Sequence, residues 1–205
     1  SVYLAMHRSL SVNRVIKSVP KRDLGVMDEQ VEAEVDTLKA LDHPHIVRIF
    51  EAFETEEELH IVMDYAEGGD IAGVIKQMQD LSRTLPEAWT RAAIEQTAWA
   101  LEYMHGKGVI HCDLKPGNCM LLQAFSVAEM DAGRALPHVL VADFGLAEIF
   151  VGDGEGAKQV KGSPSYLAPE GFEGHLSQKS DIWALGVMLF EMFTGQRPFR
   201  GTSNL

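Results

Sequence analysis

The sequence predicts an α+β protein in which a small, mainly β region is followed by a larger, mainly helical one. Four stretches before residue 65 have the pattern of strands, namely 2–6, 14–19, 47–53 and 59–64. The paired glycines in Tyr65–Gly69 mark a connector. Beyond this connector, helices are expected to dominate.

One helix is expected inside the β region, between the second and third strands. Residues 28–41 carry apolar side chains at the spacing of a helix face, namely Val31, Val35, Leu38 and Leu41. Glu34 lies three residues after Val31 and four before Leu38, which places it on or beside this apolar stripe.

The region after the connector contains further helix signals. Thr84–Glu87 predicts a helix start with a capping box and an early proline. The run 182–190 is apolar all round, which predicts a buried helix; its nine residues are far fewer than the roughly 20 that span a bilayer. The interval 123–137 is expected to be a surface insertion. The buried face of the first of these helices is expected at Ile94, Ala98 and Leu101.

Length and composition restrict the function classes. A chain of 205 residues can build one large core or two small ones. The net charge of −12 argues against nucleic acid and anionic membranes as partners and suits a basic peptide. Only two cysteines are present, Cys112 and Cys119, which argues against a structural disulfide or a zinc site. No signal peptide is visible at the start, so a cytoplasmic setting is expected, with membrane anchoring outside this chain left open.

Five short motifs occur in a fixed order along the chain. They are Arg14–Lys17 (RVIK), His111–Asn118 (HCDLKPGN), Asp143–Gly145 (DFG), Ala168–Glu170 (APE) and Asp181–Gly186 (DIWALG). Each is weak by itself, but the second, third and fourth, in this order and with these gaps, form the signature of a protein kinase. The sequence therefore resembles the eukaryotic protein kinase family along nearly its whole length.

The resemblance implies the two-lobed protein-kinase fold, with the small β lobe and hinge at 1–66 and the helical lobe at 67–205. The chain starts where the family's strand after the glycine-rich loop starts, and it stops soon after the 182–190 helix. We therefore expect a fragment of the catalytic domain, truncated at both ends, without the glycine-rich loop and the late helices, and inactive by itself.

Phosphoryl transfer asks a protein mainly for positioning and for charge stabilisation, and the motif residues can supply both. Asp113 can accept the proton of the attacking hydroxyl, and Lys115 can neutralise charge on the transferred phosphate. Asn118 and Asp143 offer oxygen ligands to Mg²⁺. Lys17 can hold the α- and β-phosphates of ATP.

A lysine on a buried strand needs a carboxylate partner, because an unpaired buried charge is costly. Taken alone, Glu34 is a carboxylate at the margin of an apolar stripe. Its spacing before Leu38 and His43 resembles that of the family's regulatory-helix glutamate, which favours a Lys17–Glu34 pair.

The resemblance also places an adenine ring against the connector. The backbone of Asp64 and Ala66 would bond to the ring, and Met63 would be the gatekeeper behind it. The alternative for the apolar residues is ordinary core packing. The side chains expected to sandwich the ring are Val2, Val15 and Met120.

Several positions bear on the substrate. Lys115 belongs to the serine/threonine form of the catalytic motif, and Ser163 stands where that group usually has a threonine in its substrate-facing loop. Asp70 lies where basophilic kinases carry a carboxylate for an upstream arginine, so protein substrates with Ser or Thr after a basic residue are expected. The alternatives are that Asp70 caps the next helix and that Ser163 is a polar loop residue.

Within the kinases, the chain most resembles the calcium/calmodulin-dependent group, and in it the calcium-dependent protein kinases of plants and protists. The supporting stretches are Arg14–Lys17, 32–53, Phe144–Glu148 and Pro198–Thr202. No EF-hand loop is present, so any calcium sensor is expected outside this chain.

Regulation by loop phosphorylation is not expected. Cys112 replaces the arginine that usually holds a loop phosphate, and 146–161 contain no Ser, Thr or Tyr. A flanking segment or partner acting on the Glu34 helix is expected to control activity instead, and the alternative is constitutive activity.

The alternative function is a pseudokinase or nucleotide-binding scaffold. A pseudokinase commonly lacks at least one of the four key residues, and all four are present here, namely Lys17, Asp113, Asn118 and Asp143. Their presence favours the enzyme.

Overall fold

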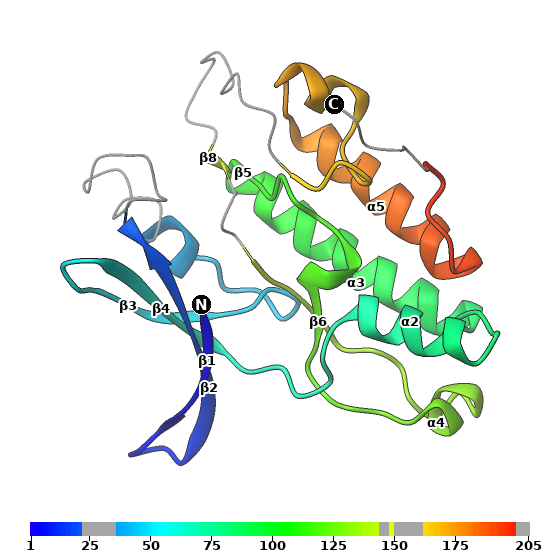
Figure 1. Cartoon of the computed structure of the whole chain (residues 1–205), viewed down its shortest axis with the longest axis horizontal. Coiled ribbons are helices and arrows are strands. Elements are labelled where there is room, and N and C mark those ends of the chain that lie inside the picture. Colours follow the sequence, from blue (N-terminus) through cyan, green and yellow to red (C-terminus); the bar gives the residue numbers. More distant parts are fainter. Residues whose placement is uncertain (22–35, 144–147, 150–161, 200–205) are drawn as a thin grey trace.

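The first part of the chain forms a four-stranded antiparallel sheet with the order β1-β2-β4-β3 (Figure 1). The computed structural model describes residues 1–21, 36–143, 148–149 and 162–199. The four predicted strands are confirmed, with ends that differ by one or two residues. They are β1 (Val2–His7), β2 (Val12–Pro20), β3 (Ile49–Glu54) and β4 (Glu58–Asp64).

The register of the sheet gathers several predicted site residues on one face. Val2 lies opposite Lys17, and Val15 lies opposite Met63. Lys17 follows Val15 by two residues, and residues two apart in a strand share a face. The four side chains therefore project from the same face, as they must if one ligand is to contact all of them.

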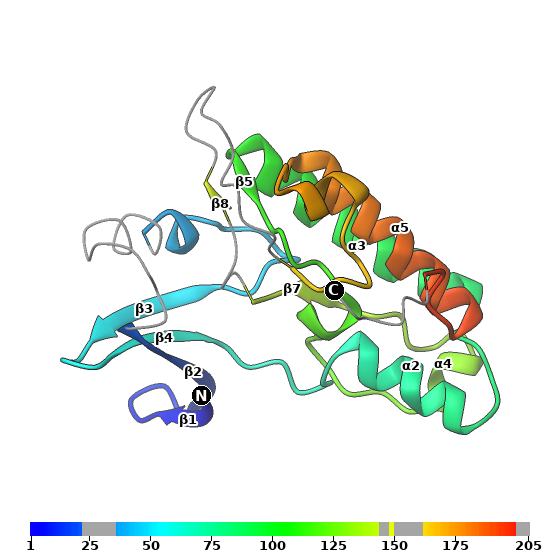
Figure 2. The same cartoon turned by 45° about the horizontal axis from the view of Figure 1, so that its top comes forward.

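The described residues after β4 form three long helices, α2 (Ile71–Asp80), α3 (Glu87–Gly106) and α5 (Gln178–Thr194). A segment without regular helix or strand connects β4 to α2, as Figure 1 and Figure 2 show. The two-lobed α+β architecture is confirmed. The short elements are β5 (Val109–Ile110), η2 (Pro116–Asn118), β6 (Cys119–Leu121), α4 (Val127–Asp131), β7 (Val139–Val141), β8 (Glu148–Ile149) and η3 (Pro169–Glu173).

Helix α3 supplies the centre of the core of the helical lobe. Its Trp89, Leu101 and Met104 are almost completely buried, as is Met188 of α5, which packs alongside. Burial of each such side chain stabilises the fold by roughly 1.5–3 kcal/mol. Because core side chains pack against α3 along its length, the loop that follows this helix has a fixed position.

The start of α3 differs from the prediction. The helix begins at Glu87, Pro86 is the N-cap, and no side chain caps the first turn. The predicted capping box at Thr84 is therefore wrong, because Thr84 lies two residues before the actual cap. Pro86 takes the extended backbone that an N-cap requires, with φ −60° and ψ 141°.

The buried face of α3 is also shifted. Leu101 is buried as predicted, but Ile94 and Ala98 are only partly buried at the edge of the core. The sequence pattern misplaced the face because a threonine takes part in it. The hydroxyl of Thr97 donates to the carbonyl of Ala93 at 2.8 Å, so it can be buried without an unpaired donor.

Helix α5 is confirmed, but not as a fully buried helix. The side chains that face α3 are buried, whereas Ile182 is 48% exposed and Phe190 45% exposed. Within the described residues, only one side of this apolar helix is packed. No helix of the described part has the length and apolar character of a membrane span.

The predicted surface insertion at 123–137 contributes to the core. It contains α4, which starts with a capping box between Ser126 and Glu129. Met130 of α4 is buried, and Asp131 pairs with Arg83 through two hydrogen bonds. The segment therefore covers the beginning of α3.

Only the end of the helix predicted at 28–41 lies within the described residues. Residues 36–39 are helical, and the chain leaves the helix at Ala40. Glu34 lies outside the described residues.

Residues 43–47 attach the sheet to the helical lobe through the backbone. The Val47 N–H donates to the carbonyl of Val141 at 2.8 Å, and the Val141 N–H donates to the carbonyl of His45 at 2.9 Å. The strand of the sheet therefore starts at Ile49, after this bridge, and not at residue 47 as predicted.

A cluster of aromatic rings reinforces this attachment. His43 stacks on Tyr103 of α3, with 5.2 Å between ring centroids. His45 lies 5.8 Å from the ring of Trp99 and 5.1 Å from the ring of His138. Burial, with the neighbouring imidazoles, lowers the pKa of His43 and of His45.

We expect the His43–His45 cluster to make the fold less stable at mildly acidic pH. The folded-state pKa of each imidazole is lowered, so the unfolded chain takes up these protons first. The stabilisation is therefore complete above about pH 6.5, the ordinary histidine pKa, and is lost as the pH falls below it. Urea unfolding at about pH 7.5, 6.5 and 5.5 measures this loss.

The matched comparison is the double variant His43→Gln and His45→Gln against His175→Gln, which alters an exposed histidine. The double variant should be less sensitive to acid than the parent, and His175→Gln should behave like the parent. An unchanged pH dependence in the double variant would contradict this role.

Candidate active site

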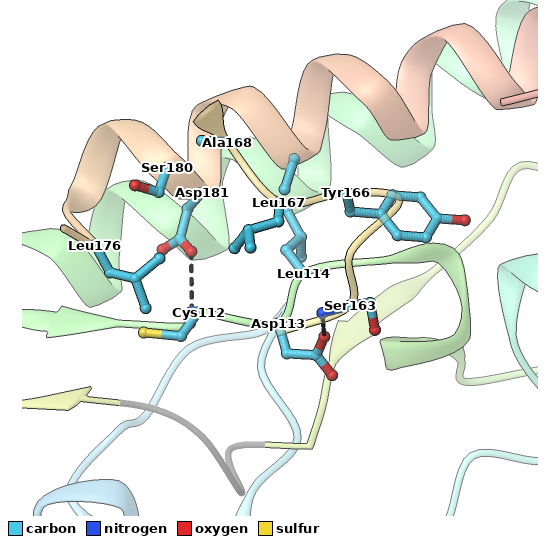
Figure 3. Close-up of a pocket in the computed structure, with 11 residues that line it drawn as sticks. Cys112, Asp113, Leu114, Ser163, Tyr166, Leu167, Ala168, Leu176, Ser180 and Asp181 are labelled. Carbon is cyan, nitrogen blue, oxygen red and sulfur yellow. Dashed lines mark hydrogen bonds between the residues drawn. The ribbon is translucent and has the colours of Figure 1, made fainter. Parts of the chain in front are cut away.

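The predicted catalytic residues converge on Asp113. Lys115 Nζ donates to Asp113 Oδ2 at 2.6 Å, and Asn118 Nδ2 donates to the same oxygen at 3.2 Å. The Ser163 N–H donates to Oδ1 at 2.8 Å, as Figure 3 shows. Lys115 also donates to the Ser163 hydroxyl at 2.8 Å. The carboxylate is therefore held in one orientation by donors from its own loop and from the segment that starts at residue 162.

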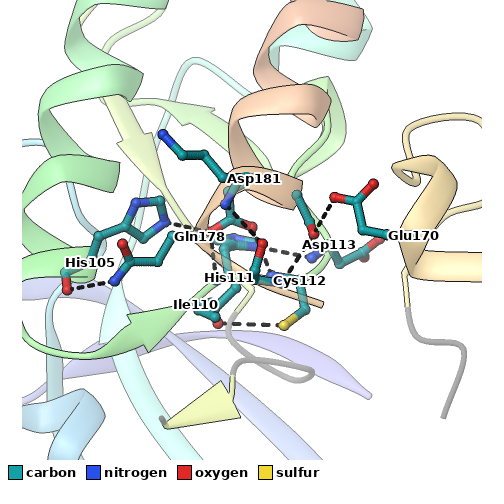
Figure 4. A network of polar contacts seen from close by, with 11 residues as sticks. His105, Ile110, His111, Cys112, Asp113, Glu170, Gln178 and Asp181 are labelled. Atoms are coloured by element: carbon teal, nitrogen blue, oxygen red, sulfur yellow. Dashed lines mark hydrogen bonds and ion pairs between the residues drawn. The ribbon is translucent and has the colours of Figure 1, made fainter. Parts of the chain in front are cut away.

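Asp181 of α5 anchors the loop that carries Asp113 through hydrogen bonds to the backbone of that loop. This carboxylate is 1% exposed and accepts from the N–H of His111 at 3.0 Å and the N–H of Cys112 at 3.1 Å (Figure 4). It also bonds to His105 Nε2 at 2.8 Å. In the sequence, Asp181 is recognisable only as the first residue of the DIWALG motif. Its contacts with the backbone after β5 join residues 70 and 69 positions apart, which motif spacing does not reveal.

Two residues of the site have a left-handed backbone. Cys112 has φ +67° and Asp143 has φ +64°. Residues other than glycine rarely adopt this conformation, and they do so mostly where the surrounding structure imposes it. At Cys112 the two hydrogen bonds to Asp181 on consecutive N–H groups impose it.

Asn118 and Asp143 lie at the same end of a two-stranded ladder. Cys119 pairs with Val141 in the antiparallel β6–β7 pair, so the residue before β6 and the residues after β7 are neighbours. The Ala142 N–H donates to the Asn118 carbonyl at 2.8 Å. The Asn118 amide nitrogen is used on Asp113, which leaves its amide oxygen as the ligand atom. Two oxygen ligands fit Mg²⁺, which keeps several waters and binds substrate phosphates.

The predicted partner of Lys17 lies outside the described residues. Within the described part, Lys17 Nζ pairs with the carboxylate of Asp143, which joins the sheet to the helical lobe. The Lys17 side chain is 25% exposed and that of Asp143 45% exposed, so this ion pair lies at an open surface and not in the core. The Lys17–Glu34 pair stays a prediction.

The connector after β4 combines a buried backbone group with neighbouring apolar side chains. Ala66 is 8% exposed, and within the described residues its backbone has no hydrogen-bond partner, although buried backbone groups are usually paired. Ala66 belongs to an apolar cluster with Val47, Leu140 and Ala142, and Met63 and Met120 pack against this cluster. The Asp64 N–H is already used, since it donates to Arg48 at 3.1 Å.

The remaining apolar site residues are less enclosed. Val15 is half-buried on the face that it shares with Lys17, and Val2 is 66% exposed on β1. The structure thus brings Met63, Ala66 and Met120 together directly and places Val15 beside Met63 through the register of the sheet.

Asp70 is the N-cap of α2. Its Oδ1 accepts from the Gly73 N–H at 2.7 Å, so the capping alternative is confirmed. Asp70 also forms an isolated bridge with Met120, which places it beside the connector.

The segment from 162 to 167 is fixed to α5. The hydroxyl of Tyr166 donates to Glu191, and burial together with that carboxylate raises the pKa of Tyr166 above its ordinary value. The hydroxyl therefore remains a donor at neutral pH. Arg197 donates to the Ser165 hydroxyl at 2.7 Å.

The site contains one carboxylate, Asp113, bonded to a lysine and an amide, and a second carboxylate, Asp143, paired with Lys17. This set of groups suits phosphoryl transfer. The family model for the protein kinase domain matches residues 1–205, and the chain belongs to this family.

Named relatives agree with the family. The chain is 33% identical over 207 residues to serine/threonine-protein kinase ATG1a of Arabidopsis thaliana, covering 100% of this chain and 31% of the relative. It is 33% identical to human serine/threonine-protein kinase ULK1, covering 98% and 19%. It is 34% identical to serine/threonine-protein kinase 33 of Bos taurus, covering 97% and 40%. The chain thus spans well under half the length of each of these relatives.

Proposed function

We propose that the intact protein transfers the γ-phosphate of ATP to serine or threonine hydroxyls of protein substrates. One observation carries this proposal: a single carboxylate, Asp113, is oriented by Lys115, Asn118 and the backbone of Ser163. The relatives described above are all serine/threonine-protein kinases, which supports the same reaction.

Each residue has a distinct part in the proposed reaction. Asp113 orients the substrate hydroxyl and accepts its proton, and Lys115 neutralises charge that develops on the transferred group. Lys17 holds the non-transferred phosphates, and Ser163 positions the acceptor peptide. Asn118 and Asp143 would hold Mg²⁺, which would neutralise charge on the phosphates when bound.

The proposed nucleotide site lies where the sheet meets the helical lobe. Asp64 and Ala66 present backbone groups to the adenine, Met63 closes the space behind it, and a set of apolar side chains covers its faces. Glu34 is proposed as the carboxylate that pairs with Lys17 when the nucleotide is bound. The covering side chains are Val2, Val15 and Met120.

The direct test uses the intact protein, ATP labelled in its γ-phosphate, and peptide pools that carry Ser, Thr or Tyr as the only acceptor. Label is expected in the Ser and Thr pools and not in the Tyr pool, and chelation of Mg²⁺ should abolish it. Nucleotide binding without transfer to any pool would support the scaffold alternative.

The finer assignment to the calcium-dependent subgroup has no support among the relatives named above, so the proposal stops at the Ser/Thr protein kinases. Control by a flanking segment or partner acting on the Glu34 helix is proposed, whereas a calcium sensor has no support among these relatives. Glu34 and most of the loop at 146–161, on which this proposal rests, lie outside the described residues.

Asp70 is proposed to read an upstream arginine of the substrate in addition to capping α2. Asp70→Ala should lower the free energy of unfolding by about 1 kcal/mol, because the Gly73 N–H loses its acceptor. Asp70→Asn should keep the cap but lose the charge. Both variants should reduce the kcat/KM ratio of an Arg peptide to its Ala counterpart by roughly tenfold, if an exposed carboxylate–arginine contact supplies about 1.4 kcal/mol. An unchanged ratio in both variants would leave Asp70 with the capping role alone.

A further inference from the structure

The outer face of the four-stranded sheet, which is opposite the face of Lys17, presents three exposed aromatic side chains. Side chains alternate along a strand and directly paired residues share a face, so the register places Tyr3 and Phe53 on the outer face. Phe50 lies there as well, because its ring contacts Arg14, which is three residues before Lys17 on β2. Tyr3 is 57% exposed, Phe50 41% and Phe53 44%. Large parts of the three rings are therefore accessible from solvent.

One of these rings already binds an arginine of the same chain. The Arg14 guanidinium lies 3.9 Å from the centroid of the Phe50 ring, which is a cation–π distance. The same guanidinium lies 3.4 Å from a carboxylate oxygen of Asp64. The charges of Arg14 and Asp64 therefore compensate each other, and an aromatic ring with a carboxylate beside it holds a guanidinium on this face.

Phe53 has the same kind of surroundings, but no arginine or lysine lies over its ring within the described residues. Glu51 precedes it by two residues on β3, and Glu58 precedes His60 by two residues on β4, so both carboxylates share the outer face with the ring. His60 stacks on Phe53 with 4.9 Å between ring centroids, and its Nε2 lies 3.9 Å from Glu58. One side of the Phe53 ring is therefore occupied by an imidazole, and the ring is still 44% exposed.

The hairpin between β3 and β4 makes this end of the outer face acidic. Glu54 is compensated, because it pairs with Lys21 at 2.7 Å. Glu56 and Glu57 at the tip are exposed and form no ion pair within the described residues. The hairpin points away from the helical lobe, as Figure 1 and Figure 2 show. The further cation Arg48 lies at the other end of β3, 5.6 Å from the Phe50 ring, so the end near Phe53 keeps an excess of negative charge.

We propose that the outer face of the sheet binds an arginine-containing segment of a partner protein, with the arginine stacked on Phe53 and paired with Glu51 or Glu58. The planar guanidinium suits this place, because it can stack on an aromatic ring and bond to a carboxylate at the same time. The arrangement repeats that of Arg14 on Phe50, except that the partner supplies the cation.

The charge of the face determines the class of partner. The hairpin carboxylates repel nucleic acid, an anionic membrane and a second copy of this chain that presents the same face. Tyr3, Ile16 and Val62 form an apolar row across β1, β2 and β4, and none of the three is fully buried. An apolar side chain next to the arginine would pack on this row. The inference is independent of the proposed reaction, because the face is opposite the one that carries Lys17.

The test measures binding of a fluorescent peptide, in which Arg and Leu alternate and no Ser, Thr or Tyr occurs, to the intact protein by anisotropy. Phe53→Ala and Phe53→Leu should each raise the Kd about three- to fivefold, because both remove the ring face. Glu51→Gln combined with Glu58→Gln should raise it about tenfold. The matched control is Glu95→Gln combined with Glu102→Gln, the same charge change on the exposed side of α3, which should bind like the parent.

The rate of transfer to a Ser peptide should be normal in all of these variants. Equal weakening by the two pairs of glutamine substitutions would show general attraction to an acidic chain and would overturn the proposal. Equal binding of a peptide with Gln in place of Arg, or no binding at millimolar peptide, would do the same. Self-association of the parent that is lost in Phe53→Ala, measured by sedimentation velocity, would assign the face to a second copy of the chain instead.

Discussion

Asp113→Asn is expected to lower the rate of phosphoryl transfer by roughly 10²–10⁴-fold, the contribution typical of a general base. The amide is nearly isosteric and can keep the Ser163 N–H as a donor to its oxygen. It cannot accept the substrate proton, and it presents no charge to Lys115. ATP affinity should change little, because Asp113 is not among the residues proposed to hold the nucleotide. Initial rates with a Ser peptide and equilibrium ATP binding measure the two effects separately.

The matched control is Asp131→Asn, which makes the same chemical change in α4. Asp131 pairs with Arg83 at the surface of the insertion, and exposed ion pairs contribute little to stability. Transfer should be normal in this variant. A normal transfer rate in Asp113→Asn as well would show that the carboxylate is not the base.

Asp181→Ala should destabilise the fold and abolish transfer, although Asp181 touches neither nucleotide nor substrate in the proposed mechanism. Its removal leaves the buried N–H groups of His111 and Cys112 without acceptors, at about 1–3 kcal/mol for each group. It also removes the contact that holds Cys112 in its left-handed conformation, so Asp113 should lose its fixed orientation. The midpoint of urea unfolding and the kcat for a Ser peptide are the measurements.

Asp181→Asn separates the two effects. The amide keeps one oxygen as an acceptor but places an NH₂ group where the carboxylate accepted a second bond. We expect it to be folded, with kcat reduced more than KM is raised. An unchanged midpoint and an unchanged kcat in Asp181→Ala would exclude the anchoring role.

Strands, helix caps and contacts within one loop could be predicted from the sequence, because they depend on residues that are close in the chain. The four strands follow from their residue types, and α2 begins where Asp70 can cap it. The motif spacing placed Asp113, Lys115 and Asn118 on one short loop, where they meet within hydrogen-bond distance. Contacts between residues close in the chain need no knowledge of the fold.

Errors arose where burial depends on partners from elsewhere in the chain. Thr97 counts as polar in a sequence pattern, yet it lies in the core because Ala93 accepts its hydroxyl hydrogen. Phe190 counts as apolar, yet it is half exposed because one side of α5 has no partner among the described residues. The capping box expected at Thr84 was wrong, since α3 starts at Glu87 with Pro86 as its N-cap and no side chain bonded to the first turn.

The sequence by itself determined the kinase resemblance, the two lobes and the residue types of the catalytic loop, because motif order and helix or strand periodicity are local properties. Only the tertiary structure decided that Asp181 anchors that loop and that Ser163 reaches Asp113. These two contacts join residues that lie 70 and 50 positions apart in the chain. Their formation depends on how α3 and α5 pack, which no spacing in the chain records.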